Sequence, residues 1–187
     1  MTAPPRTRPA AFLDRDGVLN DVRVVDGRPH PPDGVADTRL LPGVEQACRM
    51  LAAAGLALVV VTNQPDVARG TRDPGEIDAV NRWLADRLPL DTIRVCPHDD
   101  DDGCGCRKPL PGLILDAAAD FGIDLARSVM VGDRWRDIEA GRAAGCRTVF
   151  IDRAYDEALP NPPDLVVSDL IEAVPWILDH ATGGQGT

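Results

Sequence analysis

Short apolar runs alternate with amphipathic stretches along most of the chain. The runs are rich in Val, Ile and Leu and hold three to six residues each. Short, nearly continuous apolar runs are typical of parallel strands that are covered on both faces. The predicted strands are 11–13, 56–61, 93–95, 128–131, 148–151 and 165–167.

Between these runs the apolar residues recur at helical spacing. Gly55, Gly122 and Gly145 follow three of these stretches, as glycine does where it ends a helix in the left-handed conformation. The alternation predicts an α/β fold, a Rossmann-like three-layer sandwich with a mostly parallel sheet and right-handed crossovers. The predicted helices are 43–54, 75–88, 112–121, 135–144 and 169–179.

Polar side chains follow the first four predicted strands, at the point where each strand ends. In folds of this class the ligand site lies beyond the carboxyl ends of the strands. Polar residues at four such ends are hard to explain as core packing, so we expect them to form one site. They are Asp14, Thr62, Asn63, Cys96, His98 and Asp133.

Length and composition set the class of protein. The chain has 187 residues, of which 44% are hydrophobic and 27% charged, which suits one globular domain. The first ten residues lack the apolar centre of a signal peptide, and no apolar run is long enough to span a bilayer. We therefore expect a cytoplasmic protein with an N-terminal extension at 1–10, one domain at 11–180 and a disordered, glycine-rich tail at 181–187.

The net charge of −10 argues against nucleic acid as a partner, because that binding depends on Lys and Arg side chains that neutralise phosphates. A local basic pocket is still compatible with this balance. We expect neither a nucleic-acid nor a membrane partner, and we expect a monomer.

Three of the five cysteines lie close to a histidine in a pattern typical of zinc ligands. Cys96-x-His98 is followed after five residues by Cys104-x-Cys106. Three thiolates and an imidazole make a closed tetrahedral zinc site, which is structural because no coordination position is left for substrate. The alternative is a set of free thiols near one histidine. Either case indicates a reducing compartment.

Two carboxylates, Asp14 and Asp16, follow the first predicted strand and precede Gly17. Taken alone, this pattern could be a loop that caps backbone amides and turns at the glycine. The other strand ends offer hydroxyl, amide and cationic groups for a phosphate, or oxygen ligands for a divalent cation, although helix caps and solvated charges are the simpler reading of each. These groups are Thr62, Asn63, Gln64, Arg107, Lys108, Asp133 and Asp137.

In this order, the motifs resemble the haloacid dehalogenase (HAD) superfamily of phosphohydrolases, from about residue 11 to residue 151. The branch with the greatest likeness contains heptose-bisphosphate phosphatases and histidinol-phosphate phosphatases. The stretches that carry the resemblance are 14–20, 62–64, 68–70, 96–98 and 104–109.

The resemblance implies a Mg²⁺-dependent phosphatase (phosphoric monoester hydrolase) with Asp14 as nucleophile and Asp16 as general acid and then base. Asp14 would be ionised while Asp16 carries a proton. Mg²⁺ would be held by Asp14, the backbone carbonyl of Asp16 and Asp133, with Asp137 outside its ligand set. The implied phosphate and substrate binders are Thr62, Asn63, Gln64, Arg69, Arg107 and Lys108.

The intervals between the motifs are too short for a large cap domain, so we expect loops 21–41, 64–74 and 98–107 to select the substrate. Ala68-Arg69-Gly70 resembles the heptose-phosphate branch, which implies a heptose 1,7-bisphosphate or a related sugar phosphate as substrate. Histidinol phosphate is the alternative, because the spacing of the zinc ligands suits both branches. A non-catalytic zinc-loop binding module is a hypothesis of another class, but every catalytic position is filled.

Overall fold

Six parallel strands form the centre of the computed structural model, which describes residues 7–183. Their order is β5-β4-β1-β6-β7-β8. Each predicted strand is present, with bounds that differ by at most two residues, and the predicted three-layer α/β fold is confirmed. The strands are β1 (Ala10–Leu13), β4 (Ala57–Asn63), β5 (Thr92–Cys96), β6 (Val129–Gly132), β7 (Arg147–Ile151) and β8 (Leu165–Val167).

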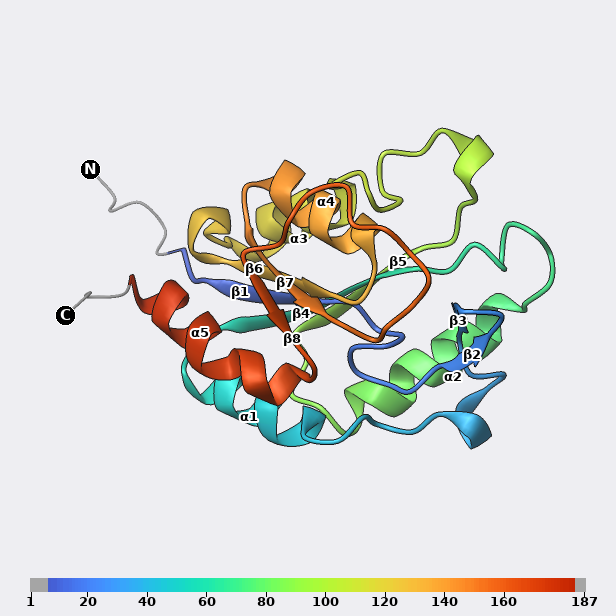
Figure 1. Cartoon of the computed structure of the whole chain (residues 1–187), viewed down its shortest axis with the longest axis horizontal. Coiled ribbons are helices and arrows are strands. Elements are labelled where there is room, and N and C mark those ends of the chain that lie inside the picture. Colours follow the sequence, from blue (N-terminus) through green and yellow to red (C-terminus); the bar gives the residue numbers. More distant parts are fainter. Residues whose placement is uncertain (1–6, 184–187) are drawn as a thin grey trace.

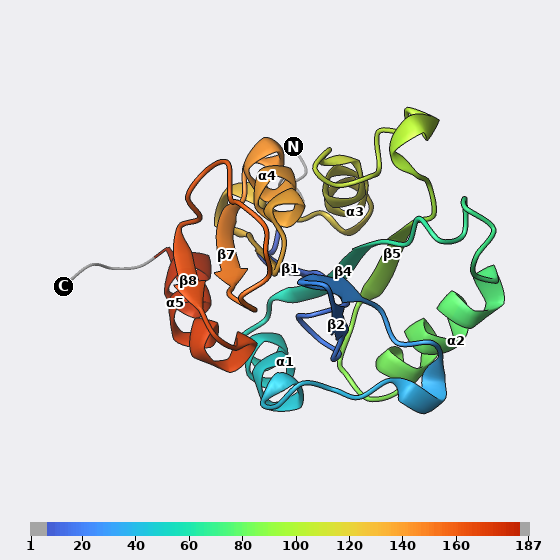
Figure 2. The same cartoon turned by 45° about the vertical axis from the view of Figure 1, so that its right-hand side comes forward.

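Helices cover both faces of the sheet, with α1 and α5 on one side and α3 and α4 on the other (Figure 1). Figure 2 shows α2 beside the β5 edge of the sheet. The last helix continues beyond its predicted end at 179 and into the segment predicted as a tail. Residues 184–187 of that tail and 1–6 of the predicted extension lie outside the described residues. The helices are α1 (Val44–Ala53), α2 (Pro74–Ala85), α3 (Gly112–Phe121), α4 (Trp135–Ala144) and α5 (Leu170–Thr182).

The core lies on both sides of the sheet, which explains why the strands are apolar at every position. Successive side chains of a strand point to opposite faces. In β1, Ala11 and Leu13 pack in the cluster that contains residues of α1 and α5. Ala10 and Phe12 pack in the other cluster, which contains residues of α3 and α4.

A two-stranded hairpin in the 21–41 loop was not predicted. Strand β2 (Arg23–Val25) pairs antiparallel with β3 (Arg28–His30). Asp26 and Gly27, at the turn, both have positive φ, 49° and 72°, as a two-residue hairpin turn of this kind requires. An Asp-Gly pair between extended segments is a hairpin signal, but the proline and charge around it hid the strands. Three short 3₁₀ helices complete the described elements: η1 (Val35–Asp37), η2 (Asp100–Asp102) and η3 (Leu125–Arg127).

The strand order places a crevice beside β1. The chain builds β1, β4 and β5 in one direction across the sheet and then returns to place β6 on the other side of β1. The carboxyl ends of β1, β4 and β6 therefore meet at the point where the strand order reverses, which is where α/β folds bind ligands. A pocket of about 630 Å³ opens there.

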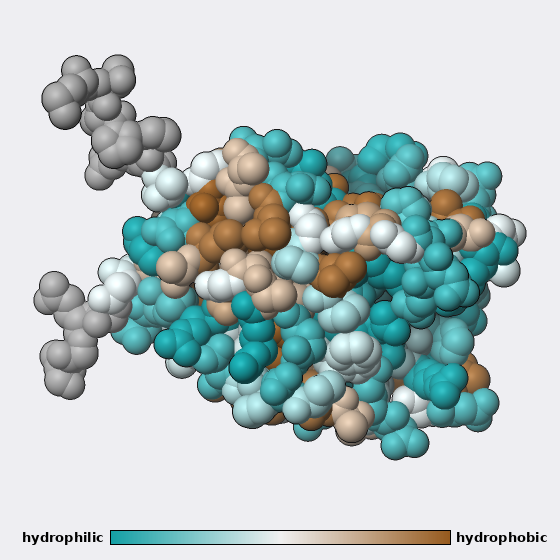
Figure 3. Space-filling view, turned by 90° about the horizontal axis from the view of Figure 1, so that it is seen from above, coloured by the Kyte–Doolittle hydropathy of each residue, from teal (hydrophilic) through white to brown (hydrophobic). Residues whose placement is uncertain are grey.

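The surface seen from above the view of Figure 1 is largely hydrophilic, with one large group of hydrophobic residues and several smaller ones (Figure 3). Among residues 7–183, no helix has the length and apolar character to cross a membrane.

Candidate active site

The pocket collects the polar residues predicted at the ends of β1, β4 and β6, whereas Cys96 and His98, predicted in the same site, are not among its lining residues and belong to a separate cluster. The hairpin and the segment that follows β7 form further parts of its wall, through Arg28, His30, Tyr155 and Glu157. The predicted residues that line it are Asp14, Asp16, Thr62, Asn63, Gln64, Arg69, Arg107, Lys108, Asp133 and Asp137.

Three carboxylates and one ammonium group form the deepest part of the pocket. One oxygen of each of Asp14, Asp133 and Asp137 lies within 4.8 Å of the others. Lys108 Nζ lies 2.7 Å from Asp14 Oδ1, 2.6 Å from Asp137 Oδ1 and 2.7 Å from the carbonyl oxygen of Val61. When all are ionised, the cluster carries an excess of two negative charges, which a divalent cation would balance.

The hydrogen bonds separate two roles within this cluster. One carboxylate oxygen of Asp137 forms the ion pair with Lys108. The other oxygen accepts a hydrogen bond from the backbone N–H of Arg134 at 3.0 Å. Both oxygens of Asp133 are buried and form no hydrogen bond of standard geometry, although the hydroxyl of Tyr155 is near enough to lower the pKa of Asp133 slightly against the other effects. A buried carboxylate without partners is costly, so Asp133 is the residue that fits a metal ion, whereas Asp137 holds Lys108.

The pKa values of the cluster reflect the same crowding. Burial raises the pKa of Asp133 well above its usual range, and the charges of Asp14 and Asp137 add to the rise. Burial also raises the pKa of Asp14 to about 7, with Lys108 opposing and Asp137 adding to the shift. Burial lowers the pKa of Lys108, but Asp137 and Asp14 reverse this and raise it overall. A divalent cation at Asp133 and Asp14 would favour both ionised carboxylates.

Two glycines let the backbone approach these carboxylates. Gly17 has φ +87°, and a Cβ atom there would lie 1.8 Å from Asp133 Oδ2. A Cβ atom on Gly132 would lie 2.0 Å from the Cβ of Asp137. No side chain fits at either distance, so both positions require glycine.

Asp16 is held by hydrogen bonds on both carboxylate oxygens. Oδ2 accepts from Arg15 Nη2 and from Gln64 Nε2, each at 2.8 Å, and Oδ1 accepts from Asn20 Nδ2 at 2.9 Å. Arg15 is fully buried and also donates to Asn81 of α2 at 3.0 Å. Burial raises the pKa of Asp16, but the Arg15 charge and these bonds outweigh it and lower the pKa.

The expectation of an ionised Asp14 and a protonated Asp16 applies to a site that holds Mg²⁺ beside Asp14, and it stays a prediction. Among the protein groups alone, the Arg15 guanidinium and the other hydrogen-bond donors lower the pKa of Asp16, whereas burial raises the pKa of Asp14. The sequence analysis assigned no role to Arg15, which lies between the two aspartates in sequence.

The predicted phosphate binders do not all present free groups. Gln64 Nε2 donates to Thr62 Oγ1 at 3.0 Å as well as to Asp16. The side-chain amide of Asn63 forms two hydrogen bonds with the main chain of Lys108. Its Oδ1 accepts from the backbone N–H of Lys108, and its Nδ2 donates to the carbonyl oxygen of Lys108, each at 3.0 Å. Asn63 thus positions Lys108, an arrangement that only the folded chain reveals.

The cysteine and histidine side chains converge as predicted, on the loop between β5 and α3. Sγ of Cys106 lies 3.2 Å from Cys96 Sγ, 3.4 Å from Cys104 Sγ and 3.3 Å from His98 Nδ1. Cys96 Sγ lies 3.7 Å from Cys104 Sγ and 3.6 Å from His98 Nδ1. Tetrahedral zinc with bonds of about 2.3 Å needs sulfur–sulfur separations of about 3.8 Å, so the four groups fit a zinc ion after a small expansion.

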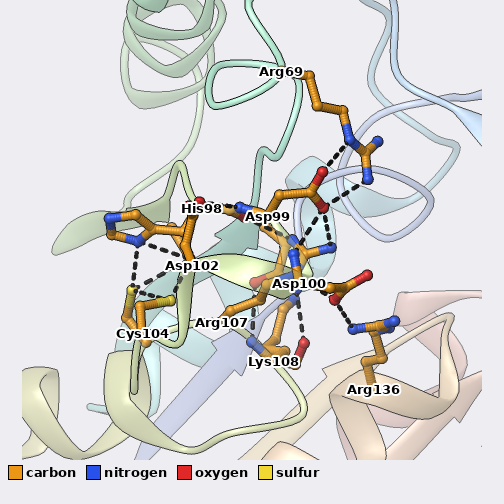
Figure 4. A network of polar contacts seen from close by, with 12 residues as sticks. Arg69, His98, Asp99, Asp100, Asp102, Cys104, Arg107, Lys108 and Arg136 are labelled. Atoms are coloured by element: carbon orange, nitrogen blue, oxygen red, sulfur yellow. Dashed lines mark hydrogen bonds and ion pairs between the residues drawn. The ribbon is translucent and has the colours of Figure 1, made fainter.

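Arginines surround the pocket mouth beside this loop (Figure 4). Arg69 binds both oxygens of Asp99, Nε to Oδ2 at 2.6 Å and Nη2 to Oδ1 at 2.8 Å. Arg107 donates to the carbonyl oxygen of His98 at 3.1 Å and so ties the rim to the cysteine cluster.

The structure adds residues that the sequence analysis did not assign to the pocket. Arg134 binds Glu157 through two bonds of 2.6 Å, which joins α4 to the segment after β7. The hydroxyl of Tyr155 is buried without a partner. A Cβ on Gly17 would lie 3.1 Å from that hydroxyl, so Tyr155 borders the same space as Asp133. These contacts join distant segments and leave no local pattern in the sequence.

Comparison with known families matches residues 105–173 to a model described as HAD-hydrolase-like. The chain is 40% identical over 157 residues to D-glycero-beta-D-manno-heptose-1,7-bisphosphate 7-phosphatase of Rhodopseudomonas palustris, covering 78% of this chain and 84% of that protein. It is 38% identical over 179 residues to the Escherichia coli K12 protein of the same name, covering 88% and 91%.

A solved structure supports the same likeness. The D,D-heptose 1,7-bisphosphate phosphatase from B. bronchiseptica, complexed with magnesium and phosphate, superimposes with a TM-score of 0.78 at 34% identity. The alignment covers 92% of this chain and 99% of that one.

Proposed function

The chain belongs to the HAD-like hydrolase family that includes the D-glycero-beta-D-manno-heptose-1,7-bisphosphate 7-phosphatases, and we propose that it removes one phosphate from a heptose 1,7-bisphosphate or a related sugar bisphosphate. It is a phosphatase whose solved relative binds magnesium and phosphate. The finer assignment of substrate and of residue roles is our proposal.

The observation that carries the proposal is the cluster of Asp14, Asp133 and Lys108 at the end of β1. A buried carboxylate without a hydrogen-bond partner, Asp133, faces a second carboxylate, Asp14, within 4.8 Å. Asp14 and Asp133 would hold Mg²⁺, together with the backbone carbonyl of Asp16. When bound, Mg²⁺ supplies positive charge that stabilises the transferring phosphoryl group.

Asp14 is the nucleophile in this proposal. Its carboxylate oxygen forms a bond to phosphorus while the bond from phosphorus to the sugar oxygen breaks, which leaves an aspartyl-phosphate. Lys108, 2.7 Å from Asp14 Oδ1, is placed to bind the phosphoryl oxygens and to offset the charge that develops on them.

Asp16 transfers the protons. It gives a proton to the departing sugar oxygen and then takes one from the water that attacks the aspartyl-phosphate, which releases Asp14 and inorganic phosphate. The ionised state favoured by Arg15 suits the second step. For the first step Asp16 needs a proton, and the negative phosphate of a bound substrate raises its pKa toward that state.

Arg69 and Arg107 support a substrate with two phosphates. Both line the pocket, and Figure 4 shows both beside the loop that carries His98 and Cys104. A phosphate held there can use its binding energy to orient the reacting one. Histidinol phosphate has no second phosphate, and it is the alternative substrate.

Zinc is part of the proposal as a structural ion at Cys96, His98, Cys104 and Cys106. It would fix the loop that leads into Arg107 and Lys108. A cytoplasmic location and a monomeric state remain predictions.

The test is phosphate release from D-glycero-D-manno-heptose 1,7-bisphosphate and from histidinol phosphate, each with Mg²⁺ and with a chelator. We expect a higher kcat/KM for the bisphosphate and loss of activity with the chelator. If histidinol phosphate is the better substrate by about tenfold, roughly 1.4 kcal/mol of transition-state preference, the sugar-phosphate assignment is wrong.

A further inference from the structure

One carboxylate of the zinc loop bridges two arginines of the pocket rim. Asp100 Oδ1 accepts from Arg107 Nε at 2.8 Å and from Arg136 Nη1 at 2.9 Å. Arg107 comes from the zinc loop and Arg136 from α4, and all three residues line the pocket (Figure 4). A single carboxylate oxygen between two guanidinium groups occupies the place that an oxygen of a bound phosphate would take.

Both arginines have other contacts that hold them in place. Arg107 is 11% exposed and donates to the carbonyl oxygen of His98, with Asp99 3.7 Å away. The guanidinium of Arg136 lies 5.0 Å from the ring centroid of Trp135. Removal of the Asp100 charge would therefore leave two positioned guanidinium groups without the carboxylate that they share, while Asp99 stays 3.7 Å from Arg107.

Asp100 itself is the loosely held member of the group. Its side chain is 54% exposed, and it belongs to the three-residue helix η2. The cap of that helix uses the side chains of Asp99 and Asp102 but not that of Asp100: Asp99 Oδ1 accepts from the backbone N–H of Asp100 at 2.8 Å, and Asp102 Oδ2 accepts from the backbone N–H of Asp99 at 2.7 Å. Asp100 can rotate away from the arginines without loss of the capping interactions.

We propose that Asp100 is an internal competitor for the second anionic group of the substrate, and that Arg136 joins Arg107 in binding that group once Asp100 is displaced. This inference rests on the proposed function. The two guanidinium groups share a single oxygen of the Asp100 carboxylate, whereas a phosphate group offers them three oxygens. A phosphate group of the substrate can therefore replace Asp100. Substrates with a single phosphate leave the Asp100 bridge intact.

The experiment compares kcat/KM for the heptose 1,7-bisphosphate with kcat/KM for the matched heptose 7-phosphate, which lacks only the second phosphate. Asp100→Asn should raise kcat/KM for the bisphosphate about two- to fivefold, the range for an exposed ion pair, and leave the monophosphate unchanged. Arg136→Ala should lower the bisphosphate value by a similar factor, again without effect on the monophosphate.

Asp101→Asn is the control for Asp100, because it removes the same charge from the same helix and Asp101 does not line the pocket. Arg142→Ala is the control for Arg136 on α4. The inference would be overturned if Asp100→Asn leaves kcat/KM for the bisphosphate unchanged or lowers it. It would also be overturned if the substitution changes kcat/KM by the same factor for both substrates. Failure of the unsubstituted protein to hydrolyse the bisphosphate would instead reject the proposed function.

Discussion

Asp14 and Asp16 lie two residues apart, yet the fold gives them different surroundings. Asp14 faces other carboxylates and Lys108, whereas Asp16 faces Arg15, Asn20 and Gln64. A difference in environment of this kind lets two carboxylates take separate roles in one reaction.

The two substitutions to asparagine should therefore have distinct effects. We expect Asp14→Asn to lose turnover by several orders of magnitude, because an amide does not attack phosphorus. Asp16→Asn should lose about a hundred- to ten-thousand-fold, the usual contribution of general acid–base catalysis. Steady-state phosphate release measures both, with circular dichroism as the control for folding. Near-normal activity of Asp14→Asn would show that another group is the nucleophile.

At the scale of elements, the loop that carries the proposed zinc ligands connects β5 to Arg107 and Lys108, the proposed phosphate binders. Cys96 ends β5, and Cys106 immediately precedes Arg107 and Lys108. The position of Lys108 against Asp14 is thus linked to this loop, which a metal ion at the cysteine and histidine side chains would fix.

Elemental analysis should find about one zinc per chain in protein purified without chelators, whether or not Mg²⁺ is added. Cys104→Ser should lower the zinc content, the melting temperature and the affinity for inorganic phosphate together, because the anchor of Arg107 and Lys108 is weakened. Cys48→Ser is the matched substitution, since Cys48 is buried in α1, away from the cluster. Full activity of the zinc-free protein would show that zinc is not required for phosphate release.

A second connection joins β7 to the edge strand β8 through Asp164, the residue before β8. Its carboxylate accepts from the backbone N–H of Thr148 at 2.8 Å, from Thr148 Oγ1 at 3.0 Å and from Arg147 Nη1 at 2.6 Å. Burial raises the pKa of Asp164, but these bonds outweigh it and lower the pKa below its usual value.

Because the pKa of Asp164 is lower in the folded state, its ionised carboxylate stabilises the folded protein at pH values above the pKa of an aspartate in the unfolded chain, about 3.9. This stabilisation is lost as the pH falls through the pKa of Asp164 in the folded protein. Asp164→Asn should lower the free energy of unfolding by about 1 kcal/mol at pH 7. The difference from the unsubstituted protein should shrink toward about pH 3. Urea unfolding at both pH values measures it, with the exposed Asp116→Asn as control. An equal difference at both pH values would contradict the assignment.

At the scale of the whole molecule, the pocket combines strand ends, a hairpin, the zinc loop and α4. A pocket of about 630 Å³ with arginines at its mouth suits a polar substrate with a charge at each end. The net charge of −10 makes this group of arginines, which pair with Asp99 and Asp100, a local feature against an acidic background.

Arg69→Ala and Arg107→Ala should each reduce the preference for the heptose bisphosphate over histidinol phosphate. The less exposed Arg107 should have the larger effect, about tenfold in the ratio of kcat/KM values, because its charged hydrogen bonds are better shielded from water. Kinetics with both substrates measure the ratio, with Arg142→Ala as control. If the ratio of the two kcat/KM values is unchanged in both variants, neither Arg69 nor Arg107 binds the second phosphate.

The sequence by itself determined the sheet, the covering helices and the positions of Asp14, Asp133 and the four zinc-type ligands. These follow from local patterns, because alternating apolar runs specify doubly covered strands and ligand spacing specifies a loop site. The family was also evident from the order of its motifs.

Only the tertiary structure decided how these side chains are connected. Arg15 neutralises Asp16, Asn63 is used on the main chain of Lys108, and Asp100 bridges Arg107 to Arg136. The contacts of Asn63 with Lys108 and of Asp100 with Arg136 join residues that are distant in sequence. The contact of Arg15 with Asp16 depends on which way neighbouring side chains turn at the end of a strand. Hydrogen bonds and pKa shifts depend on distances of a few ångströms between such groups, and those distances exist only after the strands have come together.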